Sequence, residues 1–198
     1  MKVLVIVDMQ KDFVDGSLSN EMAQAMIQNM CEYIKTFDGK VICTLDTHSV
    51  NYLGTMEGHY LPVEHCIKGS DGWNLNQDIY KALRERQESL VSTVNYEDAQ
   101  QTQKALFKAE PFLIEKQSFG FLDWKDLHFE SPVFDERVDE IILVGTCTDI
   151  CVISNALILK AAYPDIRVSV LSNLCAGLSK EKHEAALEVM KSCQVEVK

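Results

Sequence analysis

A continuous apolar run of strand length opens the chain and constrains its fold more than any other feature. Lys2 to Val7 (KVLVIV) has almost no polar alternation, which is typical of a central strand buried on both faces. Lys40 to Leu45 repeats the pattern, and Glu140 to Val144 is the clearest such run in the second half. We expect further short strands at 111–115, Arg167 to Leu171 and 195–197.

Helical patterns alternate with these strands. Ser19 to Phe37 is a predicted helix, because Ser19 and Asn20 can cap its start and apolar residues recur along one stripe. Further helices are expected at 75–86, 151–162 and 180–192, whereas 91–103 is ambiguous. Alternating strands and helices predict a three-layer α/β/α, Rossmann-like fold with a mostly parallel sheet and helices on both faces. With 198 residues and 46% hydrophobic content, we expect one domain spanning 1–198.

The net charge of −11 argues against nucleic acid and anionic membranes as partners, because the protein's field would repel a polyanion. No apolar run reaches the roughly 20 residues that span a bilayer. The first residues fit a strand better than a signal peptide, so we expect a cytoplasmic protein. The seven cysteines are irregularly spaced and form no C-x-x-C pair, which argues against a disulfide scaffold.

Reactive residue types follow four of the predicted strands. Asp8, Asp46 and Lys116 each come directly after a strand, and Gly145 to Cys151 follows the fourth. In parallel sheets, ligands bind outside the carboxyl ends of the strands. Each residue alone has an ordinary interpretation, since acids often cap turns and lysines are usually solvated. Their convergence on one edge predicts a functional site.

Cys151 is the residue in this set whose chemistry is most specific. Its segment leaves a strand, turns at Gly145 and enters an apolar helix near Cys151. A cysteine at a helix N-terminus lies near free N–H groups that favour the thiolate and can form an oxyanion hole. A nearby lysine would favour the thiolate further, and an aspartate could manage the proton. Without such partners, Cys151 would be an ordinary core residue.

Asp46 and two histidines could bind a metal. Asp46-Thr-His48 lies at a strand end, and His65 lies further along the same long loop. One carboxylate and two imidazoles suit a divalent transition metal such as zinc, iron or manganese. The Asp-x-His pattern alone is weak, and either histidine could be a hydrogen-bonded polar group.

Three motifs together resemble the isochorismatase-like cysteine hydrolases and, within them, the nicotinamidase/pyrazinamidase branch. They are the strand-ending D-x-Q-x-D-F at 8–13, the lysine and aromatic-rich turn at 116–121, and G-x-x-T-D-x-C-V at 145–152. The resemblance implies that Cys151 is the nucleophile, Asp8 the general acid/base, and Lys116 the group that stabilises the thiolate and the developing anion. It also implies a cis peptide between Thr146 and Cys147, and an oxyanion hole formed by the backbone N–H groups of Cys147 and Cys151.

The same resemblance extends to the metal. Nicotinamidases carry an Asp-x-His and a later P-x-H-C-like segment, which Pro62 to Cys66 resembles with one extra residue. It implies a single divalent metal, with zinc favoured over iron or manganese, held by Asp46, His48 and His65. Glu57 is the favoured fourth ligand and His59 is its rival.

The substrate implied by the resemblance is a small aromatic amide, with nicotinamide first and pyrazinamide next. Phe13 and Phe119 resemble the residues that sandwich the ring. Tyr60 and Leu61 are further substrate-binding residues, although Leu61 stands where the family commonly has an aromatic residue. Such proteins often form homo-oligomers, but nothing in this sequence locates an interface.

Two alternatives remain open. The chain could be another hydrolase of the superfamily, acting on a carbamoyl or ureido compound or on isochorismate. It could also be a binding module or thiol redox sensor in which Cys147 and Cys151 react with each other. The second alternative would leave Asp8 and Lys116 without a role. His183, on the last predicted helix, is expected to be structural.

Overall fold

A seven-stranded sheet forms the centre of the molecule in the computed structural model, which describes residues 1–86, 92–94, 112–127, 129 and 137–198. Its strand order is β3-β4-β2-β1-β5-β6-β7, and every pairing is parallel. The strands are β1 (Lys2–Val7), β2 (Lys40–Asp46), β3 (Ser92–Val94), β4 (Phe112–Lys116), β5 (Glu140–Thr146), β6 (Arg167–Ala176) and β7 (Glu196–Val197). The predicted parallel sheet is confirmed.

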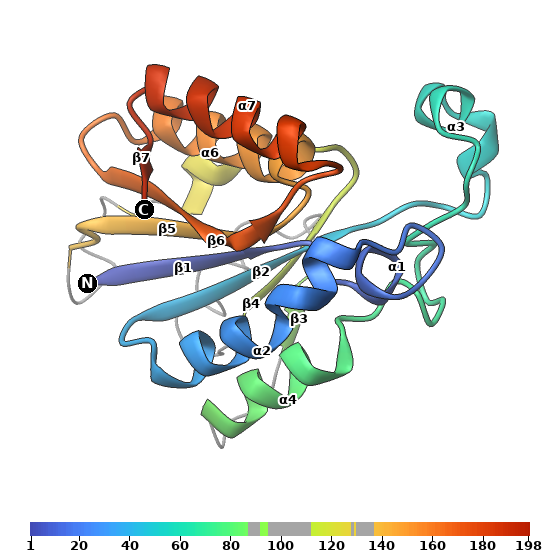
Figure 1. Cartoon of the computed structure of the whole chain (residues 1–198), viewed down its shortest axis with the longest axis horizontal. Coiled ribbons are helices and arrows are strands. Elements are labelled where there is room, and N and C mark those ends of the chain that lie inside the picture. The colour runs from blue at the N-terminus through green and yellow to red at the C-terminus, as the bar shows by residue number, and fades with distance from the viewer. Residues whose placement is uncertain (87–91, 95–111, 128, 130–136) are drawn as a thin grey trace.

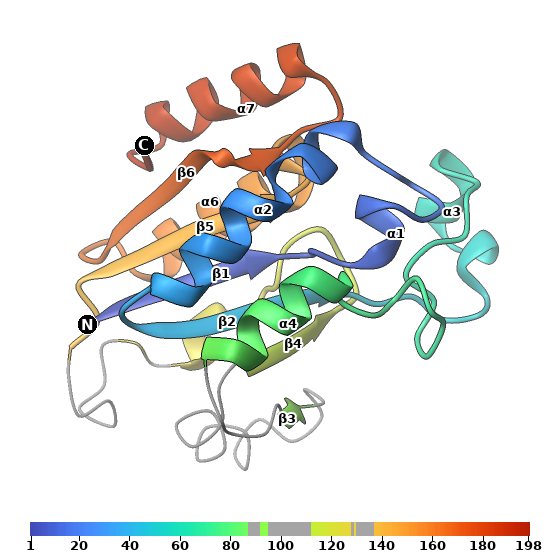
Figure 2. The same ribbon diagram turned by 60° about the horizontal axis from the view of Figure 1, so that its bottom comes forward.

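Helices cover both faces of this sheet, which confirms the three-layer architecture (Figure 1). On one face lie α2 (Glu21–Thr36) and α4 (Gln77–Arg86), which Figure 2 shows crossing in front of β1 and β2. On the other face lie α6 (Ile153–Ala162) and α7 (Lys180–Ser192). Neither these nor the other described helices are long and apolar enough to cross a membrane.

The burial of β1 explains why its sequence is apolar throughout. Val3 to Val7 are all fully buried, and successive side chains enter opposite core layers. Val3, Val5 and Val7 join the cluster beneath α6 and α7, whereas Leu4 and Ile6 join the cluster beneath α2 and α4. Because each such side chain contributes roughly 1.5–3 kcal/mol when buried, β1 anchors both layers.

The side chain of Asn20 caps the N-terminus of α2. Its Oδ1 atom accepts hydrogen bonds from the backbone N–H groups of Met22 (2.9 Å) and Ala23 (3.2 Å). The helix therefore begins at Glu21, slightly inside the predicted range of 19–37. Its buried stripe packs against α4 and the sheet.

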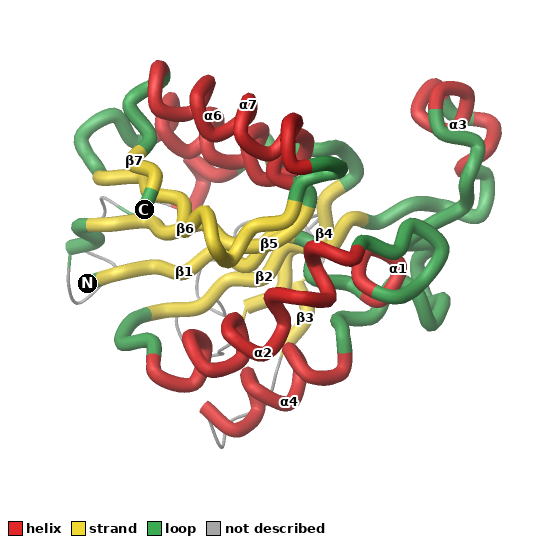
Figure 3. Tube along the Cα trace, in the orientation of Figure 1, coloured by secondary structure: helices red, strands yellow, loops and turns green. Residues whose placement is uncertain are grey.

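The segments that follow β1 and β2 leave the sheet on the same side (Figure 3). They contain α1 (Lys11–Val14), the 3₁₀ helix η1 (Tyr52–Gly54) and α3 (Met56–Tyr60), and α3 projects from the body of the molecule. The 3₁₀ helix η3 (Trp124–Leu127) follows β4. The predicted helix at 75–86 begins slightly later than expected, at Gln77.

Two boundaries differ from the sequence expectation. The helix predicted from Cys151 begins instead as a π-helical turn, Thr148–Val152, and α6 starts at Ile153. β6 continues past the predicted end at Leu171 to Ala176, because a register shift between Leu143 and Gly145 of β5 lets the pairing resume beyond the irregularity. Of the ambiguous segment 91–103, Ser92–Val94 forms β3 and the remainder lies outside the described residues.

Candidate active site

The ends of three strands bring two acids and a lysine together around one ammonium group. The Nζ atom of Lys116, at the end of β4, lies 2.8 Å from Oδ2 of Asp8 and 3.1 Å from Oδ1 of Asp46. The same atom lies 3.7 Å from the Sγ atom of Cys151. All four residues are almost completely buried. The structure thus places the predicted catalytic residues in one cluster.

Asp8 is held by the neighbouring strand. Its backbone has a φ of 49°, in the left-handed region that few non-glycine residues adopt. Its N–H donates to the carbonyl oxygen of Thr44 (3.2 Å), and the Thr44 hydroxyl donates to Oδ1 of Asp8 (2.7 Å). The other oxygen, Oδ2, lies 2.8 Å from the ammonium group of Lys116 and has no further partner among the described residues. Oδ2 therefore has a lone pair available to accept a proton.

Burial dominates the protonation of this cluster. It raises the pKa of Asp8, and Lys116 only partly offsets that effect. Burial would also raise the pKa of Asp46, but Lys116, His48 and His65 together bring it below its usual value. Burial acts to lower the pKa of Lys116, but electrostatic interactions with Asp8, Cys151 and Asp46 outweigh it and raise that pKa well above its usual value. Lys116 is therefore the cation and Asp8 the group poised to take up a proton.

The pKa of Cys151 differs from the sequence expectation. Burial raises it well above the ordinary cysteine value, and the opposing effect of Lys116 is outweighed. The thiolate expected from a helix terminus is therefore disfavoured here, because Cys151 is buried within a π-helical turn.

The backbone before Cys151 is shaped by close contact with β1. Gly145 has a φ of 127°, and a Cβ atom there would lie 2.1 Å from the carbonyl oxygen of Val7. The Thr146–Cys147 peptide bond is cis, as predicted. The Thr146 hydroxyl donates to the carbonyl oxygen of Asp8 (2.9 Å), so the segment leading to Cys151 is tied to Asp8.

Beside the ammonium group, four side chains form a cluster with the chemistry of a metal site. One ligand atom from each of Asp46, His48, Glu57 and His65 lies within 4.8 Å of the others. Oδ2 of Asp46 is 3.0 Å from Nε2 of His48 and 3.7 Å from Nε2 of His65. Two imidazoles and two carboxylates are a donor set that suits zinc, iron or manganese. Glu57 joins this cluster, whereas its rival His59 lies exposed on α3.

The surrounding residues hold these ligands in place. The Nδ1 atom of His65 lies 2.8 Å from the carbonyl oxygen of Val63, which leaves Nε2 free for a metal. The backbone of His48 pairs with 66–68, so the long loop returns beside its own start. The fully buried Tyr52 ring packs against both His48 (4.7 Å) and His65 (4.9 Å).

The predicted substrate-binding residues are less closely grouped. Phe13 is buried in α1, and its ring lies 5.5 Å from that of His65 with an edge-on orientation. Phe119 follows β4 and is 47% exposed. Tyr60 is 81% exposed at the end of α3, and the carbonyl oxygen of Leu61 accepts a hydrogen bond from the Tyr52 hydroxyl (2.9 Å). Phe13 contacts a side chain of the metal cluster, whereas Leu61 reaches only its backbone, through a hydrogen bond from its N–H to the carbonyl oxygen of Glu57 (2.8 Å).

Several supporting residues received no role from the sequence. The Gln10 side chain accepts a hydrogen bond from the N–H of Asp46 at 2.7 Å and donates to its carbonyl oxygen at 2.9 Å, so it fixes the backbone of a candidate metal ligand. Asp12 accepts the N–H of Cys66 at 2.8 Å, next to His65. Both belong to the D-x-Q-x-D-F motif, which was therefore a usable signal. Thr44 and Asn155 belong to none of the three motifs and were missed.

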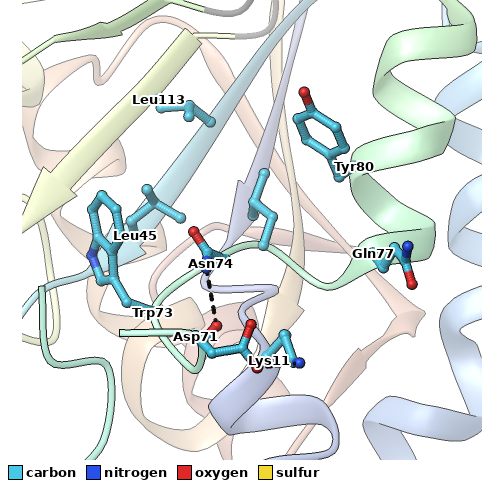
Figure 4. A pocket seen from close by; sticks show the side chains of 9 residues that line it. Lys11, Leu45, Asp71, Trp73, Asn74, Gln77, Tyr80 and Leu113 are labelled. Carbon is cyan, nitrogen blue, oxygen red and sulfur yellow. Dashed lines mark hydrogen bonds and ion pairs between the residues drawn. The ribbon is translucent and has the colours of Figure 1, made fainter. Parts of the chain in front are cut away.

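A separate cavity of about 630 Å³ lies between α4 and the sheet (Figure 4). Leu45, Trp73 and Leu113 form one wall, and Tyr80 and Gln77 project from α4 on the opposite side. No residue of the catalytic or metal clusters is among those described as lining it. The Trp73 indole N–H donates to the hydroxyl of Thr47 (2.9 Å), which lies in sequence between the candidate metal ligands Asp46 and His48. The cavity is therefore next to the site but distinct from it.

Comparison with known proteins assigns this arrangement to a family. The chain is 28% identical to a nicotinamidase/pyrazinamidase of Mycobacterium tuberculosis over 203 residues, covering 100% of this chain and 98% of that protein. Its fold is similar to the pyrazinamidase of Pyrococcus horikoshii in complex with zinc (22% identity, TM-score 0.68, 100% and 98% coverage). It is also similar to a protein of L. infantum in complex with nicotinate (20% identity, TM-score 0.73, 100% and 92% coverage). The isochorismatase domain family matches residues 2–198, and the chain belongs to that family.

Proposed function

We propose that the protein is a metal-containing cysteine amidohydrolase that converts nicotinamide and pyrazinamide to the corresponding acid and ammonia. The observation that carries this proposal is the position of Lys116, whose ammonium group contacts Asp8 and lies 3.7 Å from the Cys151 sulfur. The similarity to the nicotinamidase/pyrazinamidase of Mycobacterium tuberculosis supports this choice of substrate. The Asp-His-Glu-His cluster beside the ammonium group supports it further.

In the first half of the reaction, Asp8 accepts the proton of the Cys151 thiol and the sulfur attacks the amide carbonyl. Lys116 stabilises the negative charge on sulfur as it develops, because its pKa keeps it protonated. The backbone N–H groups of Cys147 and Cys151 bind the anionic oxygen of the tetrahedral intermediate. Asp8 then returns the proton to the leaving nitrogen, the C–N bond breaks and ammonia departs. A thioester on Cys151 remains.

In the second half, Asp8 removes a proton from water as the water oxygen attacks the thioester carbonyl. The tetrahedral intermediate collapses, the C–S bond breaks and the carboxylic acid is released. The proton returns to the Cys151 sulfur, so the thiol is restored. The raised pKa of Asp8 suits these transfers, because a carboxylate that is too weakly basic would accept a proton poorly.

Asp46, His48, Glu57 and His65 would hold one divalent transition metal, with zinc the leading choice. When bound, this ion would supply a Lewis acid for the pyridine nitrogen and for water. Oδ1 of Asp46 faces Lys116 while Oδ2 faces the histidines. Asp46 thus lies between Lys116 and the metal ion that would orient the pyridine ring.

Phe13 would pack against the pyridine ring, because it is buried and already contacts His65. Phe119 would cover the other face. Its exposed position after β4 leaves the side chain free to close over a ligand. Tyr60 and Leu61 stay predictions, since the described contacts of their side chains and backbone reach His59, Tyr52 and the backbone of Glu57 rather than the reacting groups.

The test is ammonia release from nicotinamide, pyrazinamide and an N-carbamoyl compound, with bound metal quantified in the same sample. We expect turnover of the two aromatic amides, little of the N-carbamoyl compound, and about one transition metal per chain. Preferential hydrolysis of the N-carbamoyl compound would favour the alternative substrate class. Failure to hydrolyse any of the three by folded, metal-loaded protein would contradict the proposal.

A further inference from the structure

The side chain of Asn155 connects two segments of the active site that are distant in sequence. Asn155 lies in α6, one helical turn after Cys151, and is completely buried. Its Nδ2 group donates to the carbonyl oxygens of Cys151 (2.8 Å) and Phe119 (3.2 Å). Its Oδ1 atom accepts from the backbone N–H of Phe121 (3.0 Å) and from the Trp124 indole N–H (2.9 Å).

These contacts use the full hydrogen-bonding capacity of the amide. A primary amide has two N–H donors and an oxygen with two lone pairs, and each of the four has a partner here. One contact reaches the turn that carries Cys151, and three reach the segment 119–124. Because the amide is buried, water cannot replace a contact that is lost. Asn155 therefore fixes the distance between these two segments.

Close packing supports the same connection. A Cβ atom at Gly120 would lie 2.5 Å from Cδ1 of Ile158, so the segment after β4 lies directly against α6. The Trp124 side chain is completely buried, and its carbonyl oxygen accepts the Tyr163 hydroxyl at 2.6 Å. The segment begins just after Lys116 and carries Phe119. Its placement therefore sets the position of the aromatic residue of the proposed site, whereas Lys116 is held separately in β4 by its ion pairs with Asp8 and Asp46.

We propose that Asn155 is a positioning residue that couples the Cys151 turn to the segment 119–124, holding Phe119 in register with the nucleophile. The proposal deepens the amidohydrolase function and its kinetic consequences rest on that function. Asn155 acts through the backbone of Cys151 and through the segment 119–124.

Two substitutions of Asn155 distinguish its contact with the Cys151 turn from its contacts with the segment 119–124. Asn155→Thr keeps a hydroxyl that can bond the carbonyl four residues earlier, at Cys151, but it is too short to hold the segment 119–124. Asn155→Leu keeps a side chain of similar size but removes all four side-chain hydrogen bonds of Asn155. Ser154→Ala is the matched control, because it removes a side-chain bond from the same helix to the Ile150 carbonyl (2.6 Å). The control leaves all four contacts of Asn155 in place.

Steady-state kinetics with nicotinamide give the first result. Asn155→Thr should raise KM roughly tenfold with kcat within about twofold of wild type, because the aromatic segment loosens while the nucleophile turn is kept. Asn155→Leu should also lower kcat, roughly tenfold or more. Ser154→Ala should change neither parameter by more than about twofold. Equal losses of kcat in the Thr and Leu variants, with KM unchanged, would overturn the proposal.

Fluorescence gives a second result that does not depend on turnover. The chain has two tryptophans, so a Trp73→Phe background leaves emission from Trp124 alone. Both Asn155 variants should shift this emission to longer wavelength and make it more accessible to acrylamide, whereas Ser154→Ala should not. Unchanged Trp124 emission in both variants would refute the coupling. If wild type hydrolyses no amide but the fluorescence changes occur, the proposed function fails and the coupling stands.

Discussion

A single ammonium group organises the proposed active site at the residue scale. Lys116 contacts a carboxylate from each of two neighbouring strands and lies beside the Cys151 sulfur. Because burial raises the pKa of both Asp8 and Cys151, neither group would ionise readily without this cation. Lys116 therefore supplies the charge balance that makes proton transfer from sulfur to carboxylate feasible at moderate pH.

Replacing Thr44 with valine should change the pH dependence of the reaction. In the proposed reaction Asp8 has to be ionised to accept the thiol proton, so activity should fall as pH drops through its pKa, which lies above the ordinary aspartate value. The Thr44 hydroxyl stabilises the ionised form and lowers that pKa. Thr44→Val should therefore move the acidic limb of the kcat/KM profile to higher pH.

Thr47→Val is the control for this prediction. Thr47 lies just after the end of β2, three residues beyond Thr44, and its hydroxyl bonds the Leu45 carbonyl and the Trp73 indole rather than Asp8. We expect its acidic limb to coincide with that of wild type. An unshifted limb in Thr44→Val would mean that a group other than Asp8 controls the acidic side.

The reacting residues could be predicted because strand ends are visible in sequence. Asp8, Asp46 and Lys116 each follow an apolar run, and parallel sheets bring such positions together. Thr44 and Asn155 could not be found in this way. Thr44 reaches Asp8 from the adjacent strand, and Asn155 reaches a segment more than thirty residues earlier. Only the register of β1 on β2 and the packing against α6 create those contacts.

At the scale of the elements, the approach of β5 to β1 positions the segment before the nucleophile. Gly145 pairs with Val7, and its φ of 127° places the missing Cβ against the Val7 carbonyl. The next residue, Thr146, bonds the carbonyl of Asp8. The strand pairing therefore sets the relative positions of the acid and the nucleophile.

Gly145→Ala should destabilise the fold by about 3 kcal/mol or more, because it adds a clash with backbone to a conformation that alanine rarely adopts. The measurement is the free energy of unfolding in denaturant. Gly69→Ala is the matched control, since Gly69 also has a positive φ (83°) but nothing lies within 4 Å of its missing Cβ. We expect a cost there of about 1 kcal/mol. Equal costs at the two positions would show that the contact with Val7 is unimportant.

The strands and helices followed closely from the apolar pattern, but two boundaries did not. The continuation of β6 to Ala176 depends on an irregular register against β5, which leaves no periodic signal. The π-helical turn at Thr148–Val152 and the burial of its cysteine also depend on tertiary packing. For that reason the sequence predicted the location of Cys151 correctly but its pKa wrongly.

At the scale of the whole molecule, the metal cluster connects the sheet to the projecting loop. Asp46 ends β2, Glu57 lies on α3, and His65 lies where the loop returns. A metal that binds all of these stabilises only the folded arrangement, because the ligands are not assembled in an unfolded chain. The ion would therefore contribute to stability as well as to substrate orientation.

Removing the metal should lower the melting temperature. A ligand present at a hundred times its Kd stabilises by about 2.7 kcal/mol, and a domain of this size shifts by roughly 2–4 °C per kcal/mol. We therefore expect a decrease of roughly 5–10 °C on treatment with a chelator, reversed by added zinc. The measurement is thermal unfolding with and without chelator.

Two variants control the chelator experiment. His48→Ala should melt at the same temperature with and without chelator, because a ligand of the cluster is gone. His59→Ala should behave like wild type, since this exposed histidine lies on α3 outside the cluster. A chelator effect that persists in His48→Ala would place the metal elsewhere.

Ammonia release from nicotinamide by Cys151→Ala, compared with wild type and with Cys193→Ala, tests the central claim most directly. Cys151 is buried beside Lys116, whereas Cys193 is the exposed cysteine at the end of α7. Cys151→Ala should lose at least about a thousandfold in rate while keeping its fold and metal content, and Cys193→Ala should retain full activity. Substantial turnover by folded, metal-loaded Cys151→Ala would contradict catalysis through a thioester on this residue.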